Sequence, residues 1–298
     1  KEIHFPHSLG LLYSAFTYYT GFKVNSGEYK LMGLAPYGNP IYVKKILENL
    51  IDIKEDGSFW LDQSYFDYAT GLTMTNEKFN ILFGQKPRDS KKEELTQFHM
   101  DVAASIQKVT EDIVIKLARS LREEFDIPNL CLAGGVALNC VANGELLKSE
   151  IFDNIWIQPA SGDAGGSLGG ALAVWHGELN MERNINSKDS MKGSYLGPEY
   201  SDNLIKDELD KIGAIYQELN EDEIIEKTAE DLSNSLAIGW FQGRMEFGPR
   251  ALGGRSIIGD ARSPEMQKNL NLKVKYRESF RPFAPSILND DVSEWFDI

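Results

Sequence analysis

The hydrophobic and polar positions along the chain predict several helices. Leu, Tyr, Phe and Ala dominate residues 8–22, which is typical of a buried helix. Between residues 100 and 125, apolar side chains recur every three or four positions, which predicts one long helix with an apolar face. That face consists of Val102, Ile106, Val109, Ile113, Leu117 and Leu121. Shorter patterns predict helices at 42–51 and 222–235.

Two short apolar stretches each lead into a glycine turn and then into a helical pattern. This repeated strand, turn and helix predicts an α/β fold. The first unit has a strand at 129–133, Gly134 and Gly135 in the turn and a helix near 139–148; the second has a strand at 155–158, a turn at 161–166 and a helix that reaches 175.

A polar stretch at 178–220 predicts a linker between two domains, and a further strand is expected after it at 237–241. The 298 residues are enough for two hydrophobic cores. We place the boundary near residue 205, which gives domains at 1–205 and 206–298.

Composition predicts a folded globular protein, since 42% of the residues are hydrophobic and 26% are charged. The formal net charge of -14 disfavours nucleic acid and anionic membranes as partners, because the long-range field of the protein repels both. No run of eighteen apolar residues and no signal-peptide pattern is found, so a cytoplasmic location is expected.

The cysteines and the first two histidines have weak metal-binding patterns. Cys131 and Cys140 lack the spacing of a metal motif, and we interpret both as reduced and structural. His4 and His7 are separated by Pro6 and need not share a helix face. Surface or helix-start positions are therefore favoured over a metal pair.

The two glycine turns are candidates for phosphate binding. Glycines between a strand and a helix let backbone N–H groups approach a phosphate, and the helix N-terminus adds positive potential. Neither turn matches a dinucleotide fingerprint or a P-loop, so plain packing of helix on strand remains an open alternative. Asp163 in the second turn is a candidate metal ligand, with helix capping as the commoner role.

The strongest local signal is a basic, glycine-rich segment. Nine Lys or Arg and four Asp or Glu lie between residues 244 and 281 of this acidic chain. Guanidinium groups bind phosphate in a two-point fashion, which predicts a pocket for a small phosphorylated ligand. Ion pairs with acidic parts of the protein are the alternative, and nucleic-acid binding is disfavoured because no recognition motif is present.

Several motifs, in this order, resemble the O-carbamoyltransferase family of NodU, CmcH and TobZ type. Those of the first domain are FPHSLG at 5–10, GEYKLMGLAPYG at 27–38, AGGVALN at 133–139 and PASGDAGG at 159–166; those of the second are QGRMEFGPRALG at 242–253, VKYRE at 274–278 and RPFAP at 281–285. The resemblance implies an ASKHA, RNase H-like and TsaD-like domain at 1–205, followed by the start of a YrdC-like domain at 206–298.

The resemblance also implies a chemistry. Carbamoyl phosphate and ATP would form carbamoyl adenylate in the YrdC-like domain, and the TsaD-like domain would pass the carbamoyl group to an acceptor hydroxyl. The residues expected to hold the phosphates are Arg250, Lys275 and Arg281. Those expected to hold the nucleotide are Gly134, Gly135, Asn139, Gly165 and Gly166.

Asp163 resembles the aspartate that binds the family's divalent metal, Fe or Mg. Its partner histidines are expected upstream of Lys1, because the chain opens after the segment that carries them in the family. Both ends of the sequence look cut, and weak or absent transferase activity is the corresponding expectation for this chain.

Two other classes of function remain open from the sequence. One is a TsaD-type nucleotide-binding module without carbamoyl phosphate chemistry, which would not need the basic segment around Arg250. The other is a kinase on the same ASKHA fold. The residues indicate neither the acceptor nor a general base.

Overall fold

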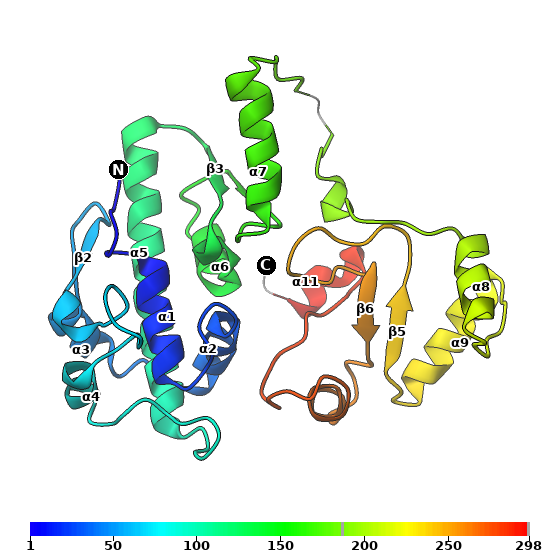
Figure 1. Cartoon of the computed structure of the whole chain (residues 1–298), viewed down its shortest axis with the longest axis horizontal. Coiled ribbons are helices and arrows are strands. Elements are labelled where there is room, and N and C mark those ends of the chain that lie inside the picture. Colours follow the sequence, from blue (N-terminus) through cyan, green and yellow to red (C-terminus); the bar gives the residue numbers. More distant parts are fainter. Residues whose placement is uncertain (186–187, 297–298) are drawn as a thin grey trace. The chain divides into compact units, whose positions relative to one another are not determined.

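The computed structural model describes residues 1–185 and 188–296 (Figure 1). The chain divides into two compact units, Lys1–Glu182 and Arg183–Ile298, whereas the sequence predicts a boundary near residue 205. Whether these units coincide with the predicted TsaD-like and YrdC-like domains stays a prediction.

The first unit is built around one long helix, α5 (Gln97–Phe125), which α1 (Leu9–Tyr19), α2 (Glu28–Leu34) and α3 (Val43–Asn49) contact. The predicted apolar face of α5 is inside, since Val102, Ile106, Val109 and Ile113 are fully buried. Burying a side chain of this size contributes about 1.5–3 kcal/mol.

Aromatic side chains fill the other side of this helical core. Phe16 and Tyr19 on α1 pack edge-on against Phe79 of α4 (Glu77–Phe83), with ring centroids 5.3 and 4.9 Å apart. Such pairs contribute beyond the area that they bury. The helical core of the first unit is therefore closely packed.

A buried histidine closes the N-terminus of α5. The backbone N–H of Thr96 donates to Nδ1 of His99 at 3.1 Å, and the two residues form a reciprocal cap. Burial, together with the nearby positive charge of Arg88, lowers the pKa of His99. The imidazole is consequently held in its neutral form at neutral pH.

The first unit contains two small sheets. Strands β1 (Ile51–Ile53) and β2 (Phe59–Leu61) are antiparallel, whereas β3 (Asn129–Leu132) and β4 (Asn154–Ile157) are parallel. Leu130 pairs with Ile155, and both pack against a buried cluster that includes Leu146 and Phe152. The helices that follow these strands are α6 (Cys140–Lys148) and α7 (Gly165–Ala173). Shorter helical turns lie at Ala35–Tyr37, Gln63–Tyr65, Gly135–Leu138 and Val174–Glu178.

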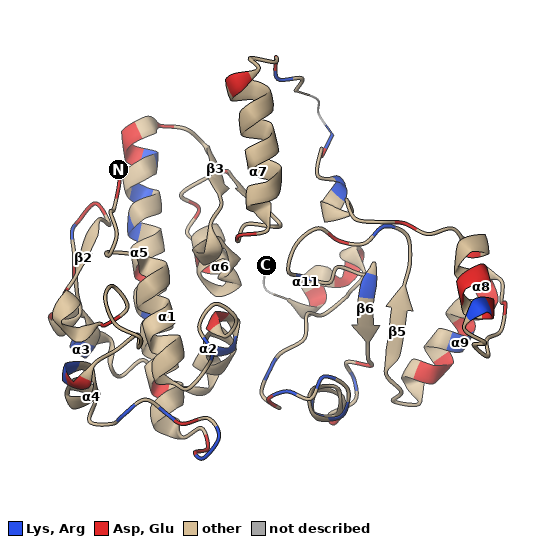
Figure 2. Ribbon diagram, viewed as in Figure 1, with Lys and Arg blue, Asp and Glu red and all other residues tan. Residues whose placement is uncertain are grey.

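The second unit has two acidic helices and an antiparallel strand pair. Figure 2 shows the acidic residues of α8 (Asp202–Lys211) and α9 (Glu221–Ser233). Strand β5 (Ile238–Phe241) pairs with β6 (Arg255–Ile258). The remaining helices and turns are Lys192–Ser194, α10 (Met266–Asn269), Leu270–Val274, Asn289–Asp291 and α11 (Val292–Trp295).

The predicted α/β class is confirmed, together with the predicted helices and strands, within a few residues at each end. The linker predicted at 178–220 is partly wrong, because α8 lies within it. The hydroxyl of Ser201 caps α8, accepting from the Leu204 N–H at 3.4 Å. Residues 186–187 of that predicted linker lie outside the described residues, as do residues 297–298 at the end of the chain.

Candidate functional site

The two glycine turns lie side by side. Strands β3 and β4 are parallel, so both turns follow the carboxyl ends of neighbouring strands. The backbone N–H of Gly134 donates to the carbonyl oxygen of Ser161 at 2.8 Å, which links the first turn to the second. Gly134 has a φ of +100°, a conformation that L side chains rarely adopt.

The glycines of the turns differ in their surroundings. A Cβ atom on Gly165 would lie 2.1 Å from the carbonyl oxygen of Ala160, so this glycine is required by packing within the protein. A Cβ on Gly135 or Gly166 would meet no atom within 4 Å. The backbone at these two positions is therefore open to a ligand. Part of the hydrogen-bonding capacity is already used, since the Gly166 N–H donates to the Asp163 carbonyl at 3.0 Å.

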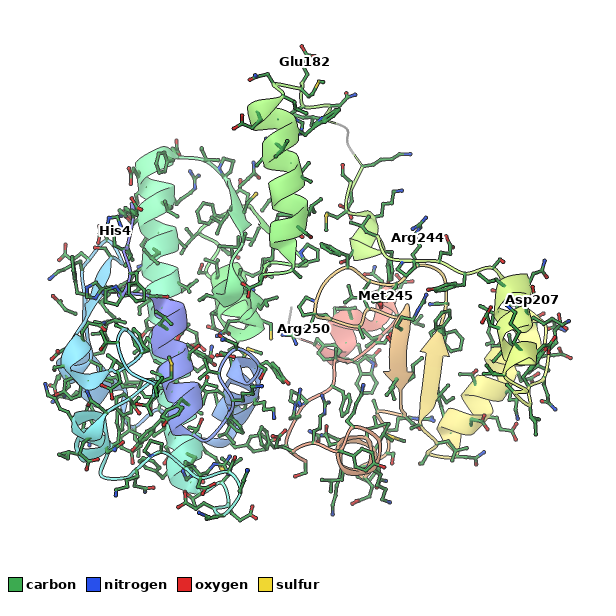
Figure 3. All side chains as sticks on the ribbon, viewed as in Figure 1. His4, Glu182, Asp207, Arg244, Met245 and Arg250 are labelled. Atoms are coloured by element: carbon green, nitrogen blue, oxygen red, sulfur yellow. The ribbon has the colours of Figure 1, made fainter. Side chains whose placement is uncertain are left out.

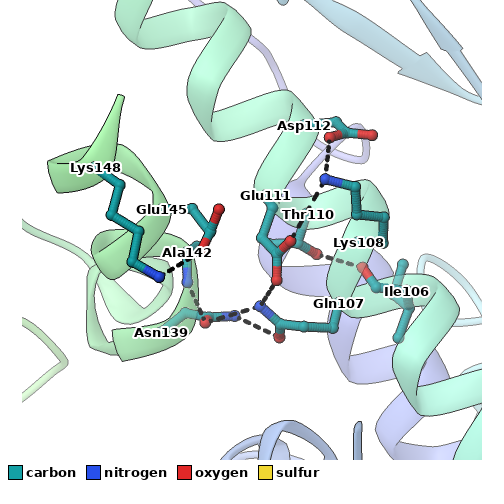
Figure 4. A network of polar contacts seen from close by, with 10 residues as sticks. All are labelled: Ile106, Gln107, Lys108, Thr110, Glu111, Asp112, Asn139, Ala142, Glu145 and Lys148. Carbon is teal, nitrogen blue, oxygen red and sulfur yellow. Dashed lines mark hydrogen bonds and ion pairs between the residues drawn. The ribbon is translucent and has the colours of Figure 1, made fainter. Parts of the chain in front are cut away.

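Asn139 is buried at the start of α6 and bonds within the protein (Figure 4). Its Oδ1 accepts from the Ala142 N–H at 3.1 Å, and its side-chain amide pairs reciprocally with that of Gln107 at 3.0 and 3.2 Å. Its role in nucleotide binding stays a prediction, and the structure adds a role in joining α6 to α5.

Gln107 is a polar hub that the sequence reading missed. It is buried and accepts from the Tyr13 hydroxyl at 2.9 Å, while its amide donates to Glu111 at 3.0 Å. Burial raises the pKa of Tyr13 strongly. The signal for Gln107 in the sequence was its place beside Ile106, on the buried side of a helix.

A groove of about 690 Å³ runs beside this network along α5 and α6. Its charged lining includes Lys108, which lies 3.0 Å from Asp112 and 3.8 Å from Glu111. None of the residues that line it is a predicted site residue. The groove therefore provides no support for the predicted nucleotide set.

Asp163 is exposed, and its role as a metal ligand stays a prediction. Within 1–185 and 188–296, no three His, Cys, Asp or Glu side chains lie together as a metal site would require. The partner histidines of Asp163 are expected upstream of Lys1, so the divalent metal, Fe or Mg, that the resemblance implies stays a prediction, and we derive no step through it. The capping alternative is wrong, because Ala164 holds the N-cap position of α7.

The two histidines and two cysteines considered as weak metal-binding patterns do not form a metal site among the described residues. His7 accepts from the Leu61 N–H at 3.0 Å, whereas His4 is exposed and lies 3.5 Å from Glu2. Cys131 and Cys140 are free and exposed, so the reduced state is as predicted but neither thiol is part of the buried core.

Glu246 organises the basic loop between β5 and β6, which carries Arg244, Met245 and Arg250 (Figure 3). Its side chain is buried, and Oε1 accepts from the backbone N–H groups of Leu252 at 2.7 Å and Gly254 at 2.8 Å. Burial alone would raise the pKa of Glu246, but these backbone donors outweigh it and lower the pKa. The group is therefore a carboxylate at neutral pH.

Residues 194–198, which the sequence reading placed in the linker, pack against this loop. The N–H of Phe247 donates to the Ser194 carbonyl at 2.7 Å, and the N–H of Met245 donates to that of Pro198 at 3.0 Å. The Ser194 hydroxyl donates to the Phe247 carbonyl at 2.6 Å, and the Tyr195 hydroxyl donates to that of Leu252. This segment is thus part of the candidate site.

Several of the nine basic side chains bond within the second unit. Arg255 donates to the carbonyl oxygens of Gln242 at 2.9 Å and Gly254 at 2.8 Å. Arg262 forms an ion pair with Asp260 at 2.8 Å. Arg244 lies 3.5 Å from Glu199 and donates to Gly197. The ion-pair alternative therefore accounts for part of the basic segment.

Arg250 and Lys275 are exposed. Among the described residues, no ion pair or hydrogen bond joins either side chain to the rest of the protein. Arg281 is half-buried and lies 3.9 Å from Glu278. The cationic groups of Arg250 and Lys275 are therefore available to a phosphorylated ligand, whereas that of Arg281 is already near a carboxylate.

Fully buried Asn271 holds the segment that contains Lys275 and Arg281. Its amide donates to the carbonyl oxygens of Arg281 at 2.8 Å and Ser279 at 3.1 Å, and its Oδ1 accepts from Arg277 at 2.6 Å. All three predicted phosphate ligands thus belong to the second unit, and the predicted nucleotide residues belong to the first.

Comparison with known proteins identifies the family. Residues 1–172 match the carbamoyltransferase N-terminus, and residues 229–298 match the carbamoyltransferase C-terminus. The chain belongs to the carbamoyltransferase family. The resemblance found in the sequence motifs is thereby confirmed, and with it membership of a family of transferases.

Relatives match along the whole chain. An uncharacterized protein of Synechocystis sp. is 62% identical over 299 residues, which cover 100% of this chain and 48% of the relative. Nodulation protein NolO of Bradyrhizobium diazoefficiens is 38% identical, with 99% of this chain and 52% of NolO covered. Nodulation protein NolNO of Sinorhizobium fredii is 39% identical, covering 99% and 41%. The carbamoyltransferase chain spans about half the length of these relatives.

In the described part of this carbamoyltransferase, no helix is long and apolar enough to cross a lipid bilayer. The cytoplasmic location expected from the sequence stays a prediction.

Proposed function

We propose that this carbamoyltransferase activates carbamoyl phosphate with ATP and transfers the carbamoyl group to a hydroxyl of a small-molecule acceptor. The observation that carries the proposal is the match of both the N-terminal and the C-terminal carbamoyltransferase regions to one chain. The exposed cationic groups of Arg250 and Lys275 support it, because they leave positive charge available for a phosphate.

The proposed activation consumes one water. Water releases inorganic phosphate from carbamoyl phosphate, and an oxygen of the resulting carbamate attacks the α-phosphorus of ATP. The bond from that phosphorus to the leaving oxygen breaks, so pyrophosphate departs and carbamoyl adenylate forms. The acceptor hydroxyl then attacks the carbamoyl carbon, loses its proton and displaces AMP.

The residues of the second unit would act on the phosphates. Negative charge shifts onto pyrophosphate oxygens as the bond breaks, and fixed cationic donors stabilise that transition state more than the ground state. In the proposal, Arg250 and Lys275 supply these donors and Arg281 supplies a third. The second unit would then correspond to the start of the YrdC-like domain.

The first unit would hold the nucleotide during transfer. Its parallel strands, the link from Gly134 to Ser161 and the open backbone at Gly135 and Gly166 support a phosphate-binding edge. We propose on this basis that it is an ASKHA-type, TsaD-like lobe. The divalent metal that the resemblance implies would use Asp163 as one of its ligands, and no step of this proposal is assigned to it.

Release of pyrophosphate from ATP tests the proposal. Pyrophosphate that appears only when carbamoyl phosphate is present, together with AMP, would support adenylation. Production of ADP from ATP and an acceptor without carbamoyl phosphate would contradict it and favour the ASKHA kinase. ATP binding without any response to carbamoyl phosphate would favour the nucleotide-binding module.

A further inference from the structure

A buried carboxylate lies behind the loop that carries Arg250. Glu246 is only 7% exposed, and its Oε1 accepts from the N–H groups of Leu252, Gly254 and Arg255 at 2.7, 2.8 and 3.3 Å. One oxygen therefore gathers three backbone donors from the far end of the loop. Glu side chains are rarely buried unless they have bonding partners, so the burial of Glu246 indicates a structural role.

The bonds of Glu246 close the loop on itself. The chain leaves β5, passes Glu246, continues through the exposed residues Gly248, Pro249 and Arg250, and returns to β6 at Arg255. Because Glu246 precedes the exposed residues and its partners follow them, its three hydrogen bonds fix the distance between the two ends of the loop. Residues between two fixed ends have fewer accessible conformations.

The carbonyl groups of the same loop are held from outside it. Ser194 donates to the Phe247 carbonyl at 2.6 Å, and Tyr195 donates to the Leu252 carbonyl. Both ends of the loop are thus bonded, while the cationic side chain at its centre has no partner among the described residues. A rigid backbone that presents an unpaired guanidinium is the arrangement expected of a preorganised anion site.

We propose that Glu246 is a positioning residue that holds the loop 247–254 so that Arg250 is presented to carbamoyl phosphate. This inference rests on the proposed function. The carboxylate bonds to backbone N–H groups of the loop, so in this proposal its contribution passes through the backbone that it holds. An ionised acceptor forms stronger hydrogen bonds with N–H groups than a neutral amide oxygen does, which explains why a carboxylate is used.

The test combines a binding measurement with a double-mutant cycle. Calorimetry with carbamoyl phosphate is performed on the wild-type chain, Glu246→Gln, Glu246→Ala, Arg250→Ala and the double variant Glu246→Gln/Arg250→Ala. We expect Glu246→Gln to weaken binding about tenfold and Glu246→Ala to weaken it more. In the Arg250→Ala background, Glu246→Gln should change the affinity less than twofold, because the residue that it positions is absent.

Loop order is measured independently of any ligand. Trypsin cleaves after Arg250, and the cleavage rate should rise several-fold in Glu246→Gln. Glu226→Ala, which removes an exposed carboxylate of α9, is the matched control and should leave both cleavage and binding unchanged. Circular dichroism verifies the fold, and Glu246→Gln replaces Glu246→Ala if the latter does not fold.

The outcomes separate the two proposals. Wild-type affinity in folded Glu246 variants would overturn the positioning role and leave the proposed function standing, as would an equal loss of affinity in the presence and absence of Arg250. Absence of binding to the wild type would overturn the proposed function, and with it the presentation of Arg250 to this substrate.

Discussion

The backbone N–H of Gly134 donates a 2.8 Å hydrogen bond to the carbonyl oxygen of Ser161. This bond joins the turn after β3 to the turn after β4, so two segments that are separate in the sequence form one edge. Gly134 has a φ of +100°, a conformation that L side chains rarely adopt, so the turn favours glycine at this position.

Replacement of Gly134 should disturb both turns. In Gly134→Ala, a side chain must adopt a backbone conformation reserved for glycine, at a cost of about 1–3 kcal/mol. We expect a corresponding loss in the free energy of unfolding, measured with urea, and weaker ATP binding, measured by calorimetry. Gly144→Ala is the control: it lies inside α6, its Cβ would meet no atom within 4 Å, and it should stabilise the helix by about 0.5–1 kcal/mol. Equal stability of Gly134→Ala and the wild type would contradict the role of the turn.

Removal of the Asn139 side chain should cost more than a lost helix cap. Asn139→Ala removes the cap, worth about 1 kcal/mol, and also removes two of the hydrogen bonds of the buried Gln107 amide, which costs about 1–3 kcal/mol more. Urea unfolding measures the sum. The double variant Gln107→Met/Asn139→Ala should be less destabilised than the sum of the two single variants, because each single variant already loses the same reciprocal pair of hydrogen bonds. Strict additivity would show that the reciprocal pair contributes nothing.

Stability should depend on pH through His99. Its pKa is lowered by burial and by Arg88, so the unfolded chain binds a proton at a higher pH than the folded chain does. The free energy of unfolding should therefore be greatest above the ordinary histidine pKa and decrease as the pH falls from that value toward the lowered one. His99→Gln should flatten this slope, whereas His4→Gln, at an exposed position, should retain it. An unchanged slope in His99→Gln would assign the effect to other groups.

The sequence predicts those elements whose evidence is local. The helix α5 follows from a repeat of apolar residues within one stretch, and the strands before the glycine turns follow from short apolar runs. The helix α8 was missed because its polar composition resembles a linker, although Ser201 and the apolar residues that follow it were a usable signal.

The supporting residues of the site could not be predicted, because their partners are distant in sequence. In the sequence, Glu246 is one acidic residue in a basic motif, and nothing there indicates that its carboxylate accepts from three backbone N–H groups. The position of Gln107 beside Ile106 indicates burial, but it does not indicate the partners Tyr13 and Asn139, which are distant in sequence. The sequence motifs at 242–253 and 274–278 do indicate Arg250 and Lys275. The contact of these residues with a ligand stays a prediction.

The most direct test of the account is calorimetric titration of carbamoyl phosphate into the wild-type chain and into Arg250→Ala and Lys275→Ala. Each substitution removes a charge-assisted hydrogen bond worth about 1.5–3 kcal/mol, so affinity should fall roughly ten- to a hundredfold in each variant. Arg262→Ala removes the same charge from a side chain already paired with Asp260 and should bind like the wild type. Loss of binding confined to Arg250→Ala and Lys275→Ala is the predicted result. Equal affinity in all four proteins, or no binding to the wild type, would contradict a carbamoyl phosphate site in the second unit.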